Sequence, residues 1–485
     1  MRIKESGMSS DDRKHTICLL NDSFPPIIDG VANAVLNYAK YIERDHGHAI
    51  VVTPHISDAD DSNYDFPVVR YPSIDLRKHI GYVAGYPFSP EAAHIVESSR
   101  VSLLHTHCPV TSCILARQLA ESMQLPLVLT WHTKYDIDIA KAVRGKALQE
   151  GAIRALLYNV NACDEVWTVS KGAGENLRSL GYEGEYIVMP NGVDLPHEQV
   201  SDDLVAEVTA GYDLPDGVPV FLFIGRLMWY KGLRIILDAL AALKAQDIDF
   251  RMVFIGGGGD ETEVREYTAE LGLLSKVYFA GVISDREKLR AWYRRSDLFL
   301  FPSTFDTNGL VVREAAASDT AAVVIEGSCA AEDIEKDING FFIEENADAL
   351  AAKLRELAAD PDRMKTVGEA AGRDLYMSWE DAVANAYTRY EVVIDRYKSG
   401  CYKTRLPYDY DFFRANGELM ETLGDLDAAR RAIQHDAEVL REDIDRTVRS
   451  KKNKAMTEII TAGYELSTQL RETADAFWEF LDRYL

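Results

Sequence analysis

The sequence predicts an α/β protein with two doubly wound domains, each a parallel β-sheet covered by helices, followed by a helical extension. Three observations predict this architecture. The chain has 485 residues, which is too long for one ordinary core. Short apolar runs alternate with amphipathic stretches, as in βαβ units, and the alternation starts again after Asn191. From about residue 412 onward, the chain is rich in Glu, Asp, Arg, Leu and Ala and has little Gly or Pro.

In the first domain, the apolar run 16–20 predicts a buried strand. A loop with Pro and Gly follows, and an amphipathic helix is expected over about 32–44. The further strands expected in this domain are 49–53, 103–104, 127–130 and 165–169. Helical stretches between these runs predict parallel pairing.

In the second domain, the strands are expected at 220–224, 252–255, 277–280, 298–301 and 322–325. A long helix over about 379–397 closes it. The domain boundary is placed in the polar stretch 195–217. In sheets of this kind, ligands bind outside the carboxyl ends of the strands, here in a cleft between two domains.

Composition limits the classes of function. The chain is 47% hydrophobic and 27% charged, as in ordinary globular proteins, with a net charge of −25. That charge argues against non-specific binding to nucleic acid, and against attraction to anionic lipid except through a local basic patch. The six cysteines form no C-x-x-C, so a reduced, cytosolic setting is expected. No signal peptide or transmembrane run is expected.

The segment FPSTFDTNGLVVRE, residues 301–314, is the most informative. It places Asp306 on a loop and Glu314 eight positions later, with a helix expected to begin at Asn308-Gly309-Leu310. Carboxylates accept from sugar hydroxyls, and free helix N–H groups face phosphate oxygens. A nucleotide-sugar carries both groups. The alternative is a surface loop followed by a helix with an ordinary exposed Glu.

A second motif, at 225–232, follows the strand VFLFI. Arg226 and Lys231 lie five positions apart in this strand-to-helix turn and can clamp a diphosphate from two sides. The alternative is a solvated charged turn.

Three weaker signals lie at other strand ends. Gly30 permits close backbone approach to phosphate or sugar. His132 comes just past a strand end, on the cleft side. The run 256–259 has glycines like a dinucleotide-binding loop, but acidic residues follow it, so a tight βα turn is favoured. Cys108 and Cys113 lie near two histidines, but this stretch is typical of a strand end and helix start, and no metal is expected there.

Read in order, NDSFPPIIDGV, HTHCP, WHTKYD, VWTVSKGAGENL, MPNGVD, FIGRLMWYKG, FAGVISDREKL and FPSTFDTNGLVVRE resemble glycosyltransferase family 4. These are retaining enzymes of the GT-B fold, in which two Rossmann-like domains face a central cleft. The resemblance covers about residues 15–397 and is strongest to the bacterial members that glucosylate diacylglycerol. The domains are then expected as a tail (1–14), an acceptor-side domain (15–197), a nucleotide-sugar domain (198–377), a closing helix crossing back to the first domain (378–398) and a helical extension (399–485).

The resemblance implies roles for the charged residues. Arg226 and Lys231 match the pair that holds the donor diphosphate and stabilises its charge as it leaves. Glu314 matches the carboxylate that grips the nucleoside ribose. Asp306 stands where the family usually has Glu, in contact with donor-sugar hydroxyls.

The resemblance also implies contacts through the backbone and the first domain. Asn308, Gly309 and Leu310 would offer amides to the donor, and Gly30 and His132 match positions near the diphosphate and sugar. The implied chemistry is front-face transfer with retained configuration, without a protein nucleophile. No metal or other cofactor is expected, because the two cations would neutralise the leaving diphosphate.

The sequence departs from the family at three places. Asp306 is one methylene shorter than the usual Glu, which changes its reach by about 1.5 Å. The family's Glu-Ala-x-Ala-x-Gly-x-Pro stretch is EAAASDTAA here, with Ser318-Asp319 in place of the glycine region. The loop before Gly30 lacks the frequent double glycine.

Residues 139–157, IAKAVRGKALQEGAIRALL, carry four basic residues and one acidic residue between apolar ones. This pattern favours a basic amphipathic helix at a membrane surface, with an ordinary packed helix as the alternative. The expected location is cytoplasmic, peripheral on the inner membrane face.

Three functions remain open on the sequence. The first is hexose transfer from a nucleotide-sugar such as UDP-glucose to a lipid acceptor such as diacylglycerol. The second keeps the chemistry but uses a cell-wall or capsular saccharide. The third is a degenerate nucleotide-sugar-binding scaffold. The helical extension is expected either to pack on the core or to form a homodimer.

Overall fold

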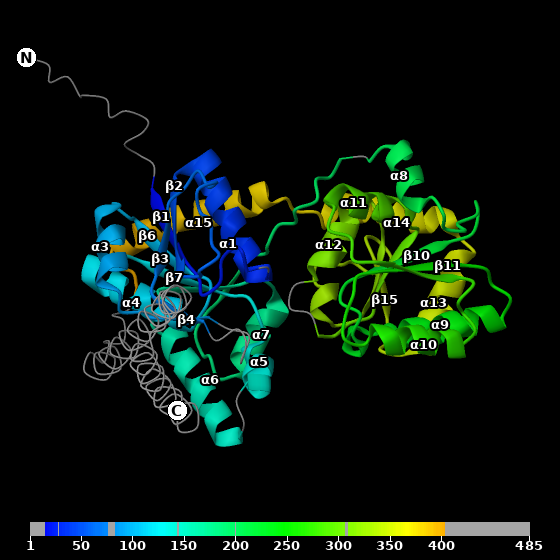
Figure 1. Cartoon of the computed structure of the whole chain (residues 1–485), viewed down its shortest axis with the longest axis horizontal. Helices are drawn as coiled ribbons and strands as arrows, with labels where there is room; N and C mark the ends of the chain where they lie inside the picture. Colours follow the sequence, from blue (N-terminus) through cyan, green and yellow to red (C-terminus); the bar gives the residue numbers. More distant parts are fainter. Residues whose placement is uncertain are drawn as a thin grey trace, which may run out of the picture. The chain divides into compact units, whose positions relative to one another are not determined.

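The computed structural model describes residues 15–27, 29–75, 83–142, 145–198, 200–305 and 309–402. Two parallel sheets organise this part of the chain, and helices cover both faces of each (Figure 1). The α/β class expected from the sequence is confirmed. Residues 403–485 of the helical extension and the tail 1–14 lie outside the described residues, as do Asp306 and Asn308.

The N-terminal sheet has, within the described residues, seven parallel strands in the order β3-β2-β1-β6-β7-β8-β9. Its strands are β1 (Thr16–Leu20), β2 (His48–Pro54), β3 (Val68–Tyr71), β6 (Leu103–Thr106), β7 (Leu127–Trp131), β8 (Glu165–Thr168) and β9 (Ile187–Val188). The short strands β4 (Ser73–Asp75) and β5 (Val83–Gly85) pair antiparallel beside it. The central strands are buried on both faces, which explains their continuous apolar runs.

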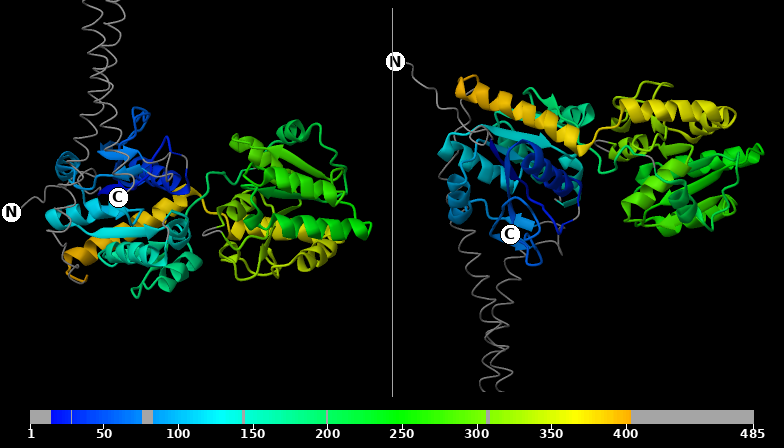
Figure 2. Two further views of the ribbon diagram at one scale, coloured as in Figure 1. Left: turned by 60° about the horizontal axis from the view of Figure 1, so that its bottom comes forward. Right: turned by 90° about the horizontal axis from the view of Figure 1, so that it is seen from above.

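The helices of this domain are α1 (Gly30–Tyr41), with a π-helical turn over Ile42–His46, α3 (Pro90–Ser98), α4 (Thr111–Met123), α5 (Tyr135–Ala142), α6 (Lys146–Val160) and α7 (Lys171–Ser179). On one face of the sheet, α1 packs in a core that also contains Tyr390 and other residues of α15 (Trp379–Lys398). On the other face, α3 and α4 cover the strands. Figure 2 shows α15, in orange, running along the N-terminal sheet.

The C-terminal sheet has the order β12-β11-β10-β13-β14-β15, all parallel within the described residues. Its strands are β10 (Val220–Ile224), β11 (Arg251–Ile255), β12 (Val277–Gly281), β13 (Leu298–Phe301), β14 (Ala322–Ile325) and β15 (Phe341–Ile343). Its helices are α8 (Asp202–Thr209), α9 (Leu233–Ala245), α10 (Glu261–Glu270), α11 (Arg286–Arg295), α12 (Leu310–Ala316), α13 (Ala347–Ala358) and α14 (Pro361–Asp374), with 3₁₀ turns at Trp229–Lys231 and Cys329–Ala331.

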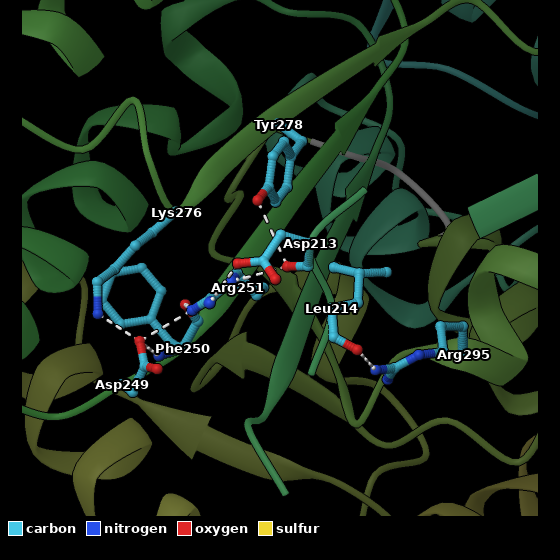
Figure 3. Close-up of polar contacts among 8 residues, drawn as sticks. All are labelled: Asp213, Leu214, Asp249, Phe250, Arg251, Lys276, Tyr278 and Arg295. Atoms are coloured by element: carbon cyan, nitrogen blue, oxygen red, sulfur yellow. Dashed lines mark hydrogen bonds and ion pairs between the residues drawn. The ribbon is translucent and has the colours of Figure 1, made fainter. Parts of the chain in front are cut away.

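A charged network closes the amino edge of this sheet (Figure 3). The guanidinium of Arg251, almost fully buried, donates to the carboxylate of Asp213 at 2.7 Å and to that of Asp249 at 2.9 Å. Arg295 donates to the carbonyl of Leu214 at 3.1 Å. These contacts fix the segment before β10 at the edge opposite to the one where ligands bind in such sheets.

Candidate active site

The strand order of the C-terminal sheet creates a crevice at its carboxyl edge. Strands β10 and β13 lie side by side, with β11 and β12 beyond one of them and β14 and β15 beyond the other. The chain therefore leaves these two strands in opposite directions, and this is where α/β sheets bind ligands. The turn after β10 carries Arg226 and Lys231, and the chain after β13 leads to Gly309 and α12. The structure thus brings the two main motifs predicted from the sequence to one edge.

The two predicted cations both lie close to one aromatic ring, that of Tyr230. Lys231 is 8% exposed, and its ammonium is 5.6 Å from the ring centroid of Tyr230 and 5.7 Å from that of Phe301. Arg226 is exposed, with its guanidinium 5.9 Å from the same Tyr230 centroid. Burial of Lys231 beside rings is unlike a solvated charged turn. An arrangement of two cations around one ring suits a bidentate anion.

Gly232 sets the position of Lys231. Its φ of +77° lies in the left-handed region, and a Cβ on it would come within 1.9 Å of the carbonyl oxygen of Pro302. Only glycine satisfies both conditions. The turn after β10 is therefore pressed directly onto the backbone that leaves β13.

The glycines at 256–259 pack against the turn that follows β10. A Cβ on Gly256 would lie 2.0 Å from the carbonyl oxygen of Gly225, and one on Gly258 would lie 2.3 Å from that of Leu227. The amide of Leu227 donates to the carbonyl of Gly257 at 3.0 Å. The sequence-based interpretation of this run as a tight βα turn agrees with these contacts.

Glu314 projects from α12 toward α11. Its side chain is 17% exposed, so it is not an ordinary exposed helical Glu. The Tyr293 hydroxyl donates to Oε2 at 3.3 Å, and Nη1 of Arg286 lies 3.5 Å from Oε1. Burial raises the pKa of Glu314, while the charge of Arg286 and the Tyr293 hydrogen bond act in the opposite direction.

The segment between the two predicted carboxylates is described only in part. Helix α12 begins at Leu310, where the sequence predicted its start. Gly309 precedes it with a φ of +58°, and a Cβ there would lie 2.8 Å from Cα of Ala330. The predicted roles of Asp306 and Asn308 fall outside the described residues.

In the N-terminal domain, Gly30 is the first residue of α1, two residues before the predicted helix start. A Cβ on Gly30 would meet nothing within 4 Å, so this helix end is open. The carboxylate of Asp29 caps it and accepts from the amides of Val31 at 2.8 Å and Ala32 at 2.7 Å. These two amides are thus occupied, whereas the family often has glycines at this loop.

His132 follows β7 and is 6% exposed. Its Nε2 is 2.9 Å from Nδ1 of His107, and burial lowers the pKa of His132 to about 3. His105 lies next to His107, with ring centroids 4.0 Å apart, and bonds to Thr130 at 2.7 Å. The three rings therefore form a neutral buried cluster at neutral pH.

Two residues near His132, at the carboxyl edge of the N-terminal sheet, were not predicted as site residues from the sequence. His107 contacts the predicted His132, and Asp22 after β1 accepts from the amides of Thr111 at 3.0 Å and Ser112 at 2.6 Å. Asp22, which follows β1, thereby caps the N-terminus of α4, the helix that follows β6. Both residues could have been predicted from the sequence, because each lies just past the end of a strand and these strand ends meet at one edge of the sheet.

Comparison with known proteins shows the family to which the chain belongs. The model of "Glycosyltransferase Family 4" matches residues 28–196, and that of "Glycosyl transferases group 1" matches residues 207–374. Together the two models cover more than half of the chain. The chain belongs to glycosyltransferase family 4.

Several relatives of this glycosyltransferase are known. It is 23% identical to an alpha-monoglucosyldiacylglycerol synthase of Streptococcus pneumoniae, over 71% of this chain and 79% of that protein. It is 22% identical to the synthase of the same name from Acholeplasma laidlawii, over 73% and 91%. It is 30% identical to a D-inositol 3-phosphate glycosyltransferase of Xylanimonas cellulosilytica, over 55% and 66%.

Solved structures share the GT-B fold. The Anabaena protein HepE in complex with UDP and glucose matches 77% of this chain and 99% of its own, with a TM-score of 0.59 and 19% identity. At this identity the likeness concerns the fold alone.

The basic amphipathic helix expected over 139–157 is two helices in this glycosyltransferase. Helix α5 ends at Ala142, and α6 begins at Lys146 after Gly145, whose φ is +98°. Gly145 breaks the helix because this backbone conformation is open mainly to glycine. The expectation of one continuous helix was therefore wrong. On α6, Leu148 is 66% exposed, and Lys146 and Arg154 of the same helix are exposed as well.

The described residues contain no helix both long and apolar enough to span a membrane. They also contain no group of three His, Cys, Asp or Glu side chains placed to hold a metal ion. Of the candidate cluster at Cys108, the thiol donates to Asp22 at 3.2 Å.

Proposed function

We propose that this glycosyltransferase moves a hexose, with UDP-glucose as the expected donor, to a lipid acceptor such as diacylglycerol, with retention of the anomeric configuration. The main support for this proposal is the crevice between β10 and β13, where Arg226 and the buried Lys231 both lie near the ring of Tyr230. Two cations at the carboxyl edge of a sheet suit the diphosphate of a nucleotide-sugar.

In this proposal, each residue acts on a different part of the donor. Arg226 and Lys231 bind the diphosphate and stabilise the charge that develops on it as the sugar leaves. Glu314 accepts from the ribose hydroxyls, and Asp306 contacts the sugar. His132 is neutral, so it offers hydrogen bonds rather than a charge to the sugar. The leaving phosphate takes the proton of the acceptor hydroxyl, and no metal takes part.

Two observations support the donor and acceptor classes. HepE, which shares the fold, was solved with UDP and glucose. Two relatives bear the name alpha-monoglucosyldiacylglycerol synthase. On α6, the exposed residues Leu148, Lys146 and Arg154 can supply apolar and basic contacts to an anionic lipid surface, which supports a peripheral, cytoplasmic-side location.

A saccharide acceptor is the second candidate. A pocket of about 1040 Å³ is lined by polar side chains such as Lys134, Asn176, Glu326 and Glu345. Carboxylates and amides accept and donate the hydrogen bonds of sugar hydroxyls. This pocket is suited to an acceptor with several hydroxyl groups, which is why a saccharide is kept as the second candidate.

The test is a transfer assay with radiolabelled UDP-glucose, presented with diacylglycerol vesicles in one arm and with soluble cell-wall or capsular saccharides in another. Formation of a labelled glycolipid is expected. Label in the saccharide alone would replace the lipid acceptor by the second candidate. Binding of UDP-glucose without transfer to either class of acceptor would favour the scaffold alternative.

A further inference from the structure

Arg286, the first residue of α11, lies between two carboxylates from different parts of the fold. Its Nη1 is 3.5 Å from Oε1 of Glu314 on α12, and its Nη2 donates to Oδ2 of Asp194 at 3.1 Å. The side chain of Arg286 is 49% exposed, while those of Glu314 and Asp194 are 17% and 25% exposed. The planar guanidinium can serve two carboxylates at once because its N–H groups point in different directions.

Asp194 is itself held by the N-terminal domain. Its Oδ2 accepts from the side-chain amide of Asn33 at 3.0 Å, and its Oδ1 from that of Asn37 at 3.1 Å. Both asparagines lie on α1, the helix that begins at Gly30. Next to Asp194, the amide of Val193 donates to the carbonyl of Met377 at 3.0 Å. Asp194 is therefore a fixed partner for Arg286.

We propose that Arg286 is a positioning residue for Glu314: it orients this carboxylate for the ribose hydroxyls of the donor and, through Asp194, links it to α1. The proposal rests on the function proposed above, in which Glu314 binds ribose. Without Arg286, Glu314 would keep only the Tyr293 hydroxyl among the partners described for its carboxylate.

The surroundings of Glu314 explain why a cation is required there. Glu314 faces Arg286 and the Tyr293 hydroxyl on α11. It also faces the negative charge of Asp194, which lies in the chain after β9. Burial and Asp194 both raise the pKa of Glu314, and Arg286 is the largest influence that lowers it. A carboxylate accepts from both ribose hydroxyls, whereas a protonated carboxyl group must use one oxygen as a donor.

The test measures UDP affinity by calorimetry between pH 5.5 and pH 8 on the full chain. Arg286→Met is expected to weaken binding by about threefold at pH 8, since a half-exposed ion pair has a modest effect. The loss grows as the pH falls, because Glu314 without Arg286 takes up its proton at a higher pH. Arg286→Lys restores part of the affinity, since one ammonium replaces the charge but not the two-sided geometry.

The matched control is Arg294→Met on the same helix, whose guanidinium pairs with Asp202 at 2.9 Å instead. It should leave UDP affinity unchanged. In a Glu314→Gln background, Arg286→Met should have no further effect, which a general loss of structure would not reproduce. Wild-type affinity in Arg286→Met at every pH, an equal loss in Arg294→Met, or a loss that persists in Glu314→Gln would overturn the proposal.

A second measurement, the pKa of Glu314 without ligand, tests the positioning role of Arg286 independently of the proposed function. If the wild-type chain binds no UDP, the uridine donor is wrong, and the positioning role is then judged without a ligand. In ¹³C-glutamate-labelled protein, with Glu314 assigned through Glu314→Gln, Arg286→Met should raise the pKa of Glu314 and Arg294→Met should not. An unchanged pKa of Glu314 in Arg286→Met would overturn the positioning role.

Discussion

At the scale of single residues, the donor site depends on how closely the turn after β10 approaches the chain that leaves β13. Gly232 makes this approach, and Lys231 before it is buried as a result. The ammonium of Lys231 is thereby held 5.6 Å from the ring centroid of Tyr230 and 5.7 Å from that of Phe301.

Gly232→Ala should therefore unfold more easily than the matched variant Gly217→Ala. Both glycines have a φ near +78°, but a Cβ on Gly217 meets nothing within 4 Å. The left-handed conformation alone costs about 1 kcal/mol for alanine, and the overlap with Pro302 adds about 2 kcal/mol or more. Urea unfolding measures both. Equal destabilisation would show that the close approach does not matter.

The histidine cluster gives a second prediction at this scale. Burial lowers the pKa of His105, His107 and His132 below the value of about 6.5 that they have in the unfolded chain. The unfolded state thus binds more protons below pH 6.5, and the free energy of unfolding should fall as the pH is lowered toward 4. Each histidine contributes about 1.4 kcal/mol per pH unit in that window.

Urea unfolding at pH 7 and pH 5 measures the effect. His107→Asn should reduce the difference between the two pH values, while replacement of an exposed histidine such as His94 should not. A free energy of unfolding that stays constant from pH 7 to pH 5 would contradict neutral burial of the cluster.

Among the residues, the sequence predicted the charged pair after β10 and Glu314, because each follows a recognisable apolar strand. The contacts of Asp22, His107 and Arg286 were not predictable in this way. Each reaches a partner on another element, and which elements are neighbours depends on the strand order. Burial of Lys231 likewise depends on packing between two turns.

At the scale of elements, α15 is joined to the N-terminal sheet by a partly buried ion pair. Arg389 donates to Glu165 at the start of β8, at 2.6 Å and 3.0 Å, and the Tyr402 hydroxyl donates to the same carboxylate at 2.7 Å. Burial opposes ionisation of Glu165, but the bonds from Arg389, Trp167 and Tyr402 outweigh it, and its pKa is lowered.

Arg389→Met should lower the free energy of unfolding by about 2 kcal/mol, because it leaves a buried carboxylate without its cation. Lys398→Met, at the exposed end of the same helix, is the control and should have little effect. Since the folded state holds Glu165 ionised, the stabilisation should be present at neutral pH and disappear as the pH falls below about 4.5. Thermal unfolding at pH 7 and pH 4 measures this, and an Arg389→Met effect that is equal at both would contradict it.

Helix α6 carries the prediction about membrane contact. Charge reversal of Lys146 and Arg154 together should release the protein from vesicles that contain anionic lipid, since each basic residue near such a surface contributes about 1 kcal/mol. The control reverses Lys365 and Lys398, which are also exposed. Vesicle co-sedimentation is the measurement. Equal retention of both variants would remove α6 from the membrane-binding surface.

Long apolar elements were predicted well, and short or broken ones were not. The strands 220–224, 298–301 and 322–325 were expected within the bounds observed. Strands β3, β9 and β15 lie at or near sheet edges and have only two to four residues, so their apolar runs are too short to stand out. The break at Gly145 was overlooked because the apolar and basic residues continue across it.

At the scale of the whole molecule, two sheets with the same parallel plan are joined by two crossings of the chain, at Val193 and at Ser378, which form an isolated bridge. A Cβ on Gly192 would come within 2.4 Å of the Trp379 amide, so the crossings are in close contact. The fold class followed from the alternation of apolar runs with amphipathic stretches, and the family followed from the order of eight motifs. The acceptor could not be predicted, because no motif in the sequence indicates which acceptor is bound.

The reaction that we propose is retaining transfer from a nucleotide-sugar held by the cations at the carboxyl edge of β10. The most direct measurement is incubation of the full chain with UDP-α-glucose and diacylglycerol, with the anomeric form of the product read by proton NMR, for wild type, Lys231→Met and Lys365→Met. We expect an α-glucosyl lipid from wild type and Lys365→Met, and a rate about a hundredfold lower for Lys231→Met. A β-glucosyl product, or an undiminished rate in Lys231→Met, would contradict it.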